Sequence, residues 1–345
     1  MAVLVTGGAG YIGSHMVLAL RDAGEQVIVL DDLSTGSREL VPEDVTFFKG
    51  DVADETLVCN IIKEHGVNAV AHFAARIVVP DSIADPLGYY RANTTKTAAL
   101  VAATIAGGVR HFIFSSTAAV YGEPAVVPVP EDLPQAPINP YGRSKLMSEL
   151  MLADAAAAHE LSYVVLRYFN VAGADPMGRA GQSTPNATHL IKAACQTSLG
   201  LRPYLEVFGT DYPTPDGSCL RDYIQVSDLV DAHMAALSHL RSGGRSLTLN
   251  CGYGRGYSVL EVIDAVKRIS GCDFEVRYSG RRAGDPAVIV ARADRIRKEF
   301  GWKPRHDALD TMVSQALAWE SRQSSPVGTW AEGRRLQREK LAEVA

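Results

Sequence analysis

The sequence predicts an α/β protein built on a Rossmann-type, doubly wound parallel sheet, with a smaller mixed α/β domain after it. Short apolar segments alternate with helical patterns through the first half of the chain, and a glycine-rich turn follows the first of them. In the second half the loops lengthen and the elements become shorter and more mixed. Strand–helix alternation of this extent favours parallel strands joined by helices that cover both faces of one sheet.

Six segments of the first half have the pattern of buried strands, because they are mostly continuous apolar runs. They cover residues 2–6, 26–31, 45–49, 69–73, 111–116 and 163–168. Helical patterns lie between them and cover residues 12–23, 55–64, 86–107 and 140–160. This order is the basis of the expected parallel sheet.

The chain changes character at about residue 174, so we expect one domain over residues 1–174 and a smaller one over residues 175–345. Helices of the second domain are expected at residues 187–199, 226–240, 259–270 and 309–320. The apolar run 246–251 has the pattern of a buried strand, where the chain crosses back into the first domain. The residues after about Ser324 are polar, and we expect them to fray.

The composition is that of an ordinary globular protein, with 47% hydrophobic and 21% charged residues. The net charge is −5 with both signs interspersed, which argues against a protein that wraps nucleic acid. The five cysteines are scattered and form no C-x-x-C pair, so we expect reduced thiols rather than disulfides or a zinc site. No membrane-spanning or signal segment is recognisable. These features predict a cytoplasmic protein without a metal, nucleic-acid or membrane partner.

The glycine-rich turn predicts a dinucleotide site. Gly7, Gly10 and Gly13 give G-x-x-G-x-x-G, and Gly8 with the last two also satisfies G-x-G-x-x-G. Such glycines permit a tight turn, close approach to a pyrophosphate and helix–strand packing, and the helix that follows presents free N–H groups. Asp31 ends the second strand, where a carboxylate bonds the ribose hydroxyls and repels a 2′-phosphate. The pattern therefore favours NAD over NADP.

Tyr141 and Lys145 form a candidate catalytic pair. They are spaced i, i+4, and Asn139 followed by Pro140 is a favourable helix start, so both side chains should lie on one helix face. A phenol with a pKa of about 10 is a poor base at neutral pH, and a nearby ammonium and a helix N-terminus both lower that pKa. Thr117 follows the expected strand 111–116, and its hydroxyl could share a substrate hydrogen bond with the tyrosine. The three residues predict a proton shuttle for an alcohol that loses a hydride.

Several motifs together resemble the extended short-chain dehydrogenase/reductase superfamily. They are T-G-G-A-G-Y-I-G, the S-S-T before A-A-V-Y-G, and Y-G-R-S-K. The runs I-G-S-H, L-R-Y-F-N, V-F-G-T-D-Y-P-T, D-G and R-D-Y-I are similar to its UDP-glucose 4-epimerase (UDP-galactose 4-epimerase) family. The resemblance extends from about residue 2 to about residue 319, which is nearly the whole chain.

The resemblance implies an NAD-dependent isomerase that interconverts UDP-glucose and UDP-galactose. Tyr141 would take the proton of the sugar 4-hydroxyl while C4 gives a hydride to tightly held NAD. The 4-keto sugar would then turn over, and the hydride would return to its other face. The resemblance also implies a homodimer formed through a four-helix bundle, with the helices at 86–107 and 140–160 as candidate elements.

The motifs and the resemblance together indicate two sets of binding residues. The cofactor set is Gly7, Gly10, Tyr11, Ile12, Gly13, Asp31, Asp32, Leu33, Ser34, Thr35, Gly36, Asp51, Val52, Phe73, Ala74, Ala75, Arg76, Tyr141, Lys145, Tyr168 and Phe169. The substrate set is Thr117, Tyr141, Asn170, His189, Phe208, Arg221, Arg282, Asp285 and Ile289.

Some positions depart from the family pattern or leave its specificity open. Arg76 stands where many relatives have a lysine, and Ala92 where relatives often have an asparagine near the cofactor. His189 replaces an asparagine that faces the substrate, and it either contacts the nucleotide diphosphate or forms part of the cleft wall. Ile289 falls at the position that flanks the sugar C2 substituent in this family. Isoleucine is of middle size there, so size alone does not decide whether an N-acetyl group fits. We expect plain hexoses to be strongly preferred.

The same residues bear on other possible functions of this fold. Sugar-nucleotide 4,6-dehydratases resemble one another in an Asp-Glu pair directly after the threonine, and Ala118 and Ala119 stand there instead. Two alternative functions stay open. One is a UDP-sugar 4-epimerase that acts on a uronate, pentose or N-acetylhexosamine, and the other is a UDP-glucuronate decarboxylase. A non-catalytic NAD-binding protein of the same fold is disfavoured, because Tyr141 and Lys145 are both present.

Overall fold

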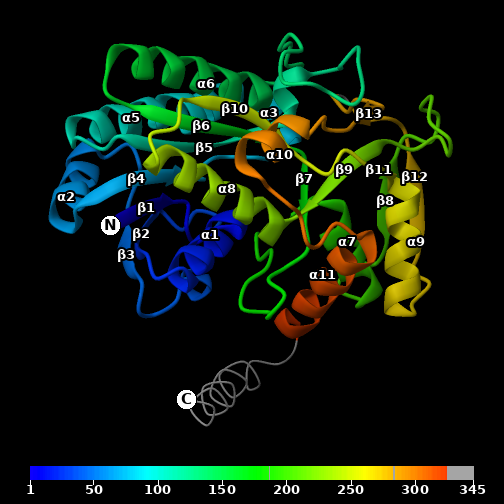
Figure 1. The fold of residues 1–345 in the computed structure, drawn as a ribbon. Coiled ribbons are helices and arrows are strands. Elements are labelled where there is room, and N and C mark those ends of the chain that lie inside the picture. The colour runs from blue at the N-terminus through cyan, green and yellow to red at the C-terminus, as the bar shows by residue number, and fades with distance from the viewer. Residues whose placement is uncertain (186, 283, 325–345) are drawn as a thin grey trace.

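The sheet lobe is built on seven parallel strands (Figure 1). The computed structural model describes residues 1–185, 187–282 and 284–324. The strand order is β10-β6-β5-β4-β1-β2-β3. The first strand, β1, lies inside the sheet, and later strands are added on both sides of it, which is the Rossmann-type arrangement that the sequence predicts. The strands are β1 (Ala2–Thr6), β2 (Gln26–Asp31), β3 (Thr46–Lys49), β4 (Val67–His72), β5 (His111–Thr117), β6 (Ser162–Tyr168) and β10 (Leu247–Cys251).

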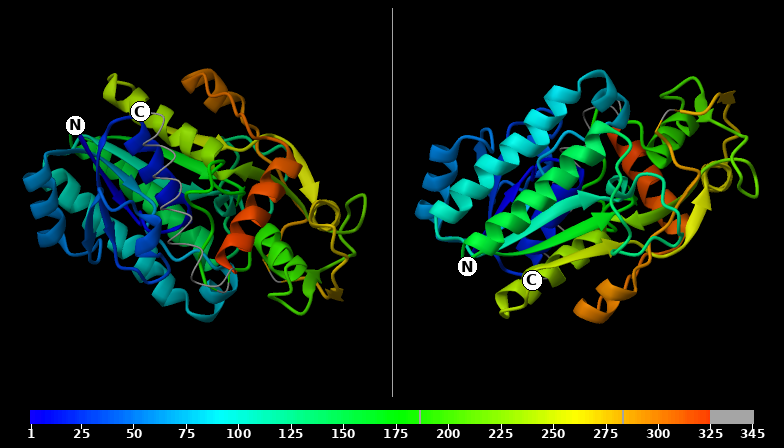
Figure 2. Two further views of the ribbon diagram at one scale, coloured as in Figure 1. Left: turned by 90° about the horizontal axis from the view of Figure 1, so that it is seen from below. Right: turned by 90° about the horizontal axis from the view of Figure 1, so that it is seen from above.

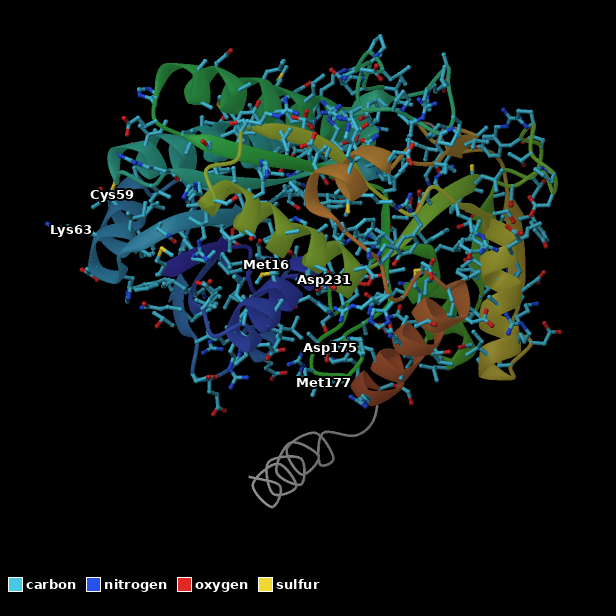
Figure 3. All side chains as sticks on the ribbon, viewed as in Figure 1. Met16, Cys59, Lys63, Asp175, Met177 and Asp231 are labelled. Atoms are coloured by element: carbon cyan, nitrogen blue, oxygen red, sulfur yellow. The ribbon has the colours of Figure 1, made fainter. Side chains whose placement is uncertain are left out.

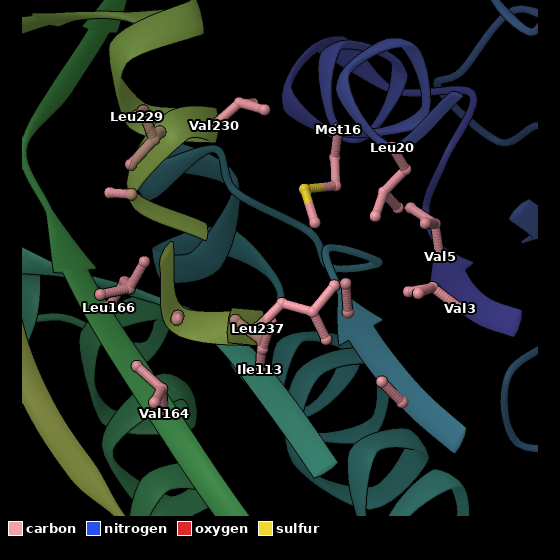
Figure 4. Packing of buried hydrophobic residues seen from close by; sticks show 14 of the residues in the cluster. Val3, Val5, Met16, Leu20, Ile113, Val164, Leu166, Leu229, Val230 and Leu237 are labelled. Atoms are coloured by element: carbon pink, nitrogen blue, oxygen red, sulfur yellow. The ribbon is translucent and has the colours of Figure 1, made fainter. Parts of the chain in front are cut away.

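Helices cover both faces of this sheet (Figure 2). They are α1 (Tyr11–Asp22), α2 (Glu55–His65), α5 (Lys96–Ala106), α6 (Pro140–Ala158) and α8 (Val226–Arg241). Val3 and Val5 face α1 and α8, where Met16 and Leu237 pack against them (Figure 4). Leu4 between them points to the other face, into the cluster under α2, α5 and α6. Because both faces are buried, the strands need the continuous apolar runs seen in the sequence.

The helix expected at residues 86–107 is present and runs from Pro86 to Ala106, but it is not α-helical throughout. The segment consists of α4 (Pro86–Tyr89), a π-helical turn η2 (Tyr90–Thr95) and α5, after a short α3 (Val79–Ala84). The wide turn presents Asn93, whose Nδ2 donates to the Arg76 carbonyl at 2.9 Å and to Ser144 Oγ at 3.0 Å. Tertiary hydrogen bonds thus accompany the π-helical turn, and no glycine or proline within it marks it in the sequence.

The second lobe lies over the carboxyl edge of the large sheet and contains two small sheets. Their strands are β7 (Asn170–Ala172), β8 (Leu205–Phe208), β9 (Leu220–Gln225), β11 (Gly256–Ser258), β12 (Val276–Ser279) and β13 (Val288–Ile289). The helices α7 (Leu190–Ser198), α9 (Val259–Ser270) and α11 (Leu309–Gln323) share one apolar core. β10 and α8 come from this half of the chain but belong to the sheet lobe, so the division at residue 174 stays an interpretation.

The loop after β7 ties the two lobes together. Asp175 and Met177 mark this loop in Figure 3. Arg179 donates to the Asp175 carboxylate at 2.8 Å and to Asp22 of α1 at 2.7 Å. Arg322 of α11 donates to a carbonyl of the same loop at 2.9 Å. These contacts hold α1 and α11 against one segment and so fix the second lobe over the sheet.

No helix in the described part of the chain has both the length and the apolarity that crossing a bilayer requires. That part of the chain also holds no group of three or more His, Cys, Asp or Glu side chains placed to bind a metal ion. The residues after Ser324 that the sequence predicts to fray lie outside the described ranges.

Candidate active site

A cleft of about 720 Å³ lies between the two lobes at the carboxyl edge of the seven-stranded sheet. This edge is where doubly wound folds bind their ligands. The predicted site residues that line it are Gly7, Gly10, Tyr11, Ile12, Gly13, Asp31, Asp32, Ser34, Thr35, Gly36, Asp51, Val52, Phe73, Ala74, Ala75, Arg76, Thr117, Tyr141, Tyr168, Phe169, Asn170, His189, Arg221, Asp285 and Ile289. Folding therefore brings most of both predicted sets into one space.

The turn after β1 has the shape of a phosphate cradle. Gly7 has a φ of +71°, and a Cβ on it would lie 2.6 Å from the Ala74 nitrogen. A Cβ on Gly13 would lie 2.1 Å from the Gly7 carbonyl oxygen, so no side chain fits between α1 and the turn. Gly10 precedes α1 without a side-chain cap, which leaves N–H groups of the first helical turn available to an anion. The residues present fit a pyrophosphate.

Asp31 ends β2 beside this turn. Its Oδ2 accepts a hydrogen bond from the Ala9 nitrogen at 2.9 Å, and its Oδ1 accepts one from the Leu33 nitrogen at 2.8 Å. Burial raises the pKa of Asp31 above its ordinary value, and the two N–H bonds oppose that rise. Each carboxylate oxygen has a further lone pair. Asp31 can therefore hold the glycine turn in place and still accept hydroxyls of a ribose.

α6 starts as the sequence predicts. The Asn139 side chain accepts a hydrogen bond from the Gly142 nitrogen at 2.9 Å, and Pro140 is the first helical residue. This cap fixes the helix at the cleft, so Tyr141 lines the cleft and Lys145 lies one turn further from it.

The catalytic candidates form one hydrogen-bonded group. The hydroxyl of Tyr141 is bonded to that of Thr117, which ends β5. Lys145 is only 3% exposed, and its Nζ donates to the Ser115 carbonyl oxygen at 2.9 Å. The Lys145 ammonium also lies 4.8 Å from the centre of the Phe114 ring, which favours a cation. A hydroxyl pair thus faces the cleft with a cation directly behind it.

The expected lowering of the tyrosine pKa is not what this structure shows. Burial raises the pKa of Tyr141 to about 12, although the hydrogen bond with Thr117 opposes the rise. Burial also lowers the pKa of Lys145 to about 7, which the Glu149 carboxylate opposes. Desolvation disfavours phenolate and ammonium alike, and residue spacing does not reveal it. Tyr141 is therefore a phenol near neutral pH, the form that can return a proton to a keto sugar.

The second lobe contributes polar groups to the far wall of the cleft. The Arg221 guanidinium lies 3.7 Å from the Asp285 carboxylate. His189 precedes α7, and its Nδ1 lies 2.7 Å from the Gln182 amide nitrogen, which can only donate. Burial lowers the pKa of His189 to about 4, so the ring is neutral and carries its proton on Nε2.

This arrangement agrees with a family match. The chain matches the model of the NAD dependent epimerase/dehydratase family over residues 3–252. The chain belongs to this family. The match includes the glycine turn, the catalytic candidates and the strand β10 that returns to the large sheet.

Relatives of this epimerase/dehydratase chain are similar over nearly their whole length. The UDP-glucose 4-epimerase of Azospirillum brasilense is 57% identical over 326 residues, which cover 94% of each chain. The structure of UDP-glucose 4-epimerase from Brucella ovis in complex with NAD has a TM-score of 0.89 at 42% identity, covering 92% of this chain and 97% of that one. The UDP-Glc/GlcNAc 4-epimerase from Campylobacter jejuni has a TM-score of 0.81 at 46% identity, covering 93% and 99%. These findings confirm the predicted resemblance and fold class.

Four predicted site residues of this epimerase/dehydratase chain do not line the cleft. Lys145 lies behind Tyr141. Leu33 has a φ of +61° and packs against the apolar core of the sheet lobe. Arg282 places its guanidinium 4.0 Å from the centre of the Phe208 ring, and this stacked pair lies beyond the lining. Their binding roles stay predictions.

Other lining residues were not predicted from the sequence. Lys96 pairs with Asp51 at 2.5 Å, and Gln182 orients His189. Neither belongs to a motif, since each reaches the cleft from a helix or loop distant in sequence. Arg76 does line the cleft, but its guanidinium pairs with Asp85 at 2.8 Å. Its charge is therefore partly neutralised in this epimerase/dehydratase site.

Proposed function

We propose that this chain interconverts UDP-glucose and UDP-galactose by transient oxidation at C4 of the sugar. The observation that carries the proposal is the Tyr141–Thr117 hydroxyl pair, which faces the cleft between the glycine turn and the second lobe with Lys145 behind it. The names of the relatives from Azospirillum brasilense and Brucella ovis support this choice of substrate.

The glycine turn and Asp31 would hold NAD, since a Cβ at Gly7 or Gly13 would block the cradle. When bound, NAD supplies the acceptor and the donor of the hydride. The Asp31 carboxylate would repel a 2′-phosphate, which favours NAD over NADP. Because the cofactor is regenerated in each cycle, the protein needs no second substrate to turn over.

Tyr141 would move the proton of the reaction. As a phenolate it accepts the proton of the sugar 4-hydroxyl, and as a phenol it returns that proton to the keto oxygen. Thr117, which is hydrogen-bonded to Tyr141, would share the hydrogen bond to the same oxygen and so hold the sugar 4-position against the tyrosine. The ammonium of Lys145 favours the phenolate through its charge. Each residue thereby serves both directions of the interconversion.

The second lobe would grip the nucleotide while the sugar turns. Arg221, Asn170 and Asp285 line the far wall, where a guanidinium can bind a diphosphate strongly and directionally. Residues near Thr117 are small, since Ala118 and Ala119 follow it in the lining. Those alanines also leave no acid or base at the positions a dehydratase uses. A sugar held only at its nucleotide end is free to present either face.

UDP-N-acetylhexosamine is a second candidate substrate. The Campylobacter jejuni relative is named for both glucose and N-acetylglucosamine forms. Ile289 lines the cleft and is only 7% exposed, so it limits the space beside the sugar. We propose that plain hexoses are preferred, because an acetamide needs both volume and a hydrogen-bond partner.

We also propose that the chain is a cytoplasmic homodimer. All five cysteines are free thiols, as expected in a reducing compartment. α5 and α6 lie side by side on the outside of the molecule (Figure 2). Met147 and Leu150 of α6 and Leu87 of the preceding α4 are exposed apolar side chains. Pairing of these helices with a second copy would cover them.

The test of the proposed function is to incubate purified protein with UDP-galactose and no added NAD. The proposal predicts that UDP-glucose forms until the two sugars reach equilibrium. A protein that contains bound NAD but leaves UDP-galactose unchanged would refute it and favour a non-catalytic NAD-binding role.

A further inference from the structure

A buried ion pair lies directly behind the catalytic helix. Arg167 on β6 and Glu149 on α6 are each 6% exposed at the side chain, and Nη2 of the arginine lies 2.6 Å from Oε2 of the glutamate. Arg167 Nε donates to both carboxylate oxygens at 3.1 Å. Removing two charges from water is costly, and such a pair is weak evidence of added stability. An effect on neighbouring groups therefore explains the presence of this ion pair better than added stability does.

The pair touches the sequence neighbours of the site residues. Ser116, which precedes Thr117, donates to Glu149 Oε1. Arg167 precedes Tyr168 and lies opposite Ser116 in the β5–β6 register. Arg167 Nη1 also donates to the Tyr121 hydroxyl at 3.0 Å. The network thus joins β5, β6 and α6 just below the positions that face the cleft.

Glu149 is a potential competitor for the Lys145 ammonium. The two residues are spaced i, i+4 on α6, which places their side chains on the same helix face. A carboxylate and an ammonium at that spacing attract each other, more strongly when buried. In the structure, however, three N–H bonds from Arg167 hold the carboxylate, and Lys145 donates to the Ser115 carbonyl instead.

We propose that Arg167 and Glu149 are positioning residues, in which Arg167 holds the Glu149 carboxylate away from Lys145 and leaves the ammonium available to Tyr141. The proposal rests on the proposed function, because it assigns the proton transfer to Tyr141. Without Arg167, Glu149 would pair with Lys145, and the carboxylate would offset the positive charge that the tyrosine otherwise faces. This loss disfavours the phenolate.

The surrounding groups do not replace Arg167. Burial raises the pKa of the nearby tyrosines, and it lowers that of His72 on β4 to about 3, so all of them are neutral near pH 7. Glu131 accepts a hydrogen bond from the Asn250 nitrogen at 3.1 Å and lies 4.0 Å from Arg295. The tyrosines are Tyr163 and Tyr168 on β6, Tyr121 in the 3₁₀ turn η3 (Ala118–Tyr121) and Tyr89 on α4.

The test is an ultraviolet titration of the Tyr141 phenolate in the NAD-loaded protein. The chain has 13 tyrosines, so each curve is the difference from the same variant carrying Tyr141→Phe. We expect Arg167→Met to move the midpoint of the titration up by about one pH unit, which lowers the phenolate fraction, and with it kcat, about tenfold at any pH below that midpoint. The double variant Arg167→Met/Glu149→Gln should return most of the way to the wild-type value, because the competing charge is gone.

A purely structural role predicts a different pattern. It predicts lower activity at every pH with an unmoved titration, and a double variant no better than the single one; either result would overturn the proposal. Arg167→Lys is the second variant if Arg167→Met does not fold, since a lysine keeps the positive charge but loses the paired N–H donors that bind both carboxylate oxygens. It should shift the titration upward by a smaller amount, and no shift would also contradict the proposal. The phenolate titration needs no turnover, so an inactive wild type would refute the proposed function separately.

Discussion

At the residue scale, burial and neighbouring charges act in opposite directions on the pKa values of the groups proposed to transfer the proton. Burial raises the pKa of Tyr141 to about 12 and lowers that of Lys145 to about 7. Near neutral pH the tyrosine is therefore a phenol, and the lysine is close to its own pKa. Accepting a proton from the sugar requires the phenolate, which becomes more populated as pH rises. The forward step should accordingly speed up with pH until the lysine loses its charge.

Tyr141→Phe tests which group carries the proton. The substitution removes the hydroxyl but keeps the ring that lines the cleft, so kcat should fall by about 10²–10⁴-fold while nucleotide binding is largely kept. Steady-state kinetics and a binding titration with UDP separate the two effects. Near-normal turnover in this variant would remove Tyr141 from the mechanism.

Ile289 tests the breadth of the sugar site. It belongs to the same buried apolar cluster as Phe169 and Tyr121 and lines the cleft, so its size should set the space next to the sugar. Ile289→Gly should raise kcat/KM for UDP-N-acetylgalactosamine, and Ile289→Tyr should abolish it, with UDP-galactose as the matched control. An unpaired buried amide costs about 1–3 kcal/mol, so the wild type should use the acetylated sugar poorly. Equal efficiency for both sugars in the wild type would show that Ile289 is not the gate.

At the element scale, sequence patterns predict those parts whose geometry is local. The strands, the cap of α6 and the crowding at Gly13 follow from apolar runs, Asn139 and glycine spacing. The π-helical turn at Asn93 and the ion pair between Lys96 and Asp51 depend on contacts between distant segments. No local pattern marks such contacts. Roles for Phe208 and Arg282 remain predictions for the same reason, because their placement depends on a fold-wide arrangement.

Two glycines of one turn should respond differently to the same change. A Cβ on Gly13 would meet the Gly7 carbonyl at 2.1 Å, so Gly13→Ala should lower the free energy of unfolding by about 1–3 kcal/mol and abolish NAD retention. A Cβ on Gly10 meets only that same oxygen, at 3.2 Å. Gly10→Ala should cost less than about 1 kcal/mol of stability but weaken NAD binding. Urea unfolding and the NAD content of purified protein provide the comparison; equal loss of stability in both variants would contradict the assigned roles.

At the scale of the whole molecule, the two lobes meet in one cleft, which is lined by both the proposed dinucleotide cradle and the proposed nucleotide-sugar wall. Most of the predicted cofactor residues lie on the sheet lobe, and most of the predicted substrate residues lie on the second lobe. The loop around Asp175 and Arg179 fixes the position of one lobe relative to the other, because it bonds to both α1 and α11. A reaction that oxidises and then reduces one carbon needs this fixed juxtaposition.

The proposed dimer can be tested on its exposed helices. Leu150 of α6 is 59% exposed, and Leu150→Glu would place a charge in the proposed interface. We expect the wild type to sediment as a dimer and the variant as a monomer in analytical ultracentrifugation. Leu201→Glu is the matched control, since Leu201 is 51% exposed in the second lobe and should leave the mass unchanged. A dimer that survives Leu150→Glu would place the interface elsewhere.

In the proposed reaction, one hydride leaves C4 and returns to the same carbon within a single cleft. A labelling experiment tests this step by following UDP-galactose that carries deuterium at C4 through conversion to UDP-glucose by the purified protein. The deuterium should stay at C4 of the product, and none should appear in water. Loss of the label to solvent, or solvent hydrogen at C4, would contradict the proposed reaction.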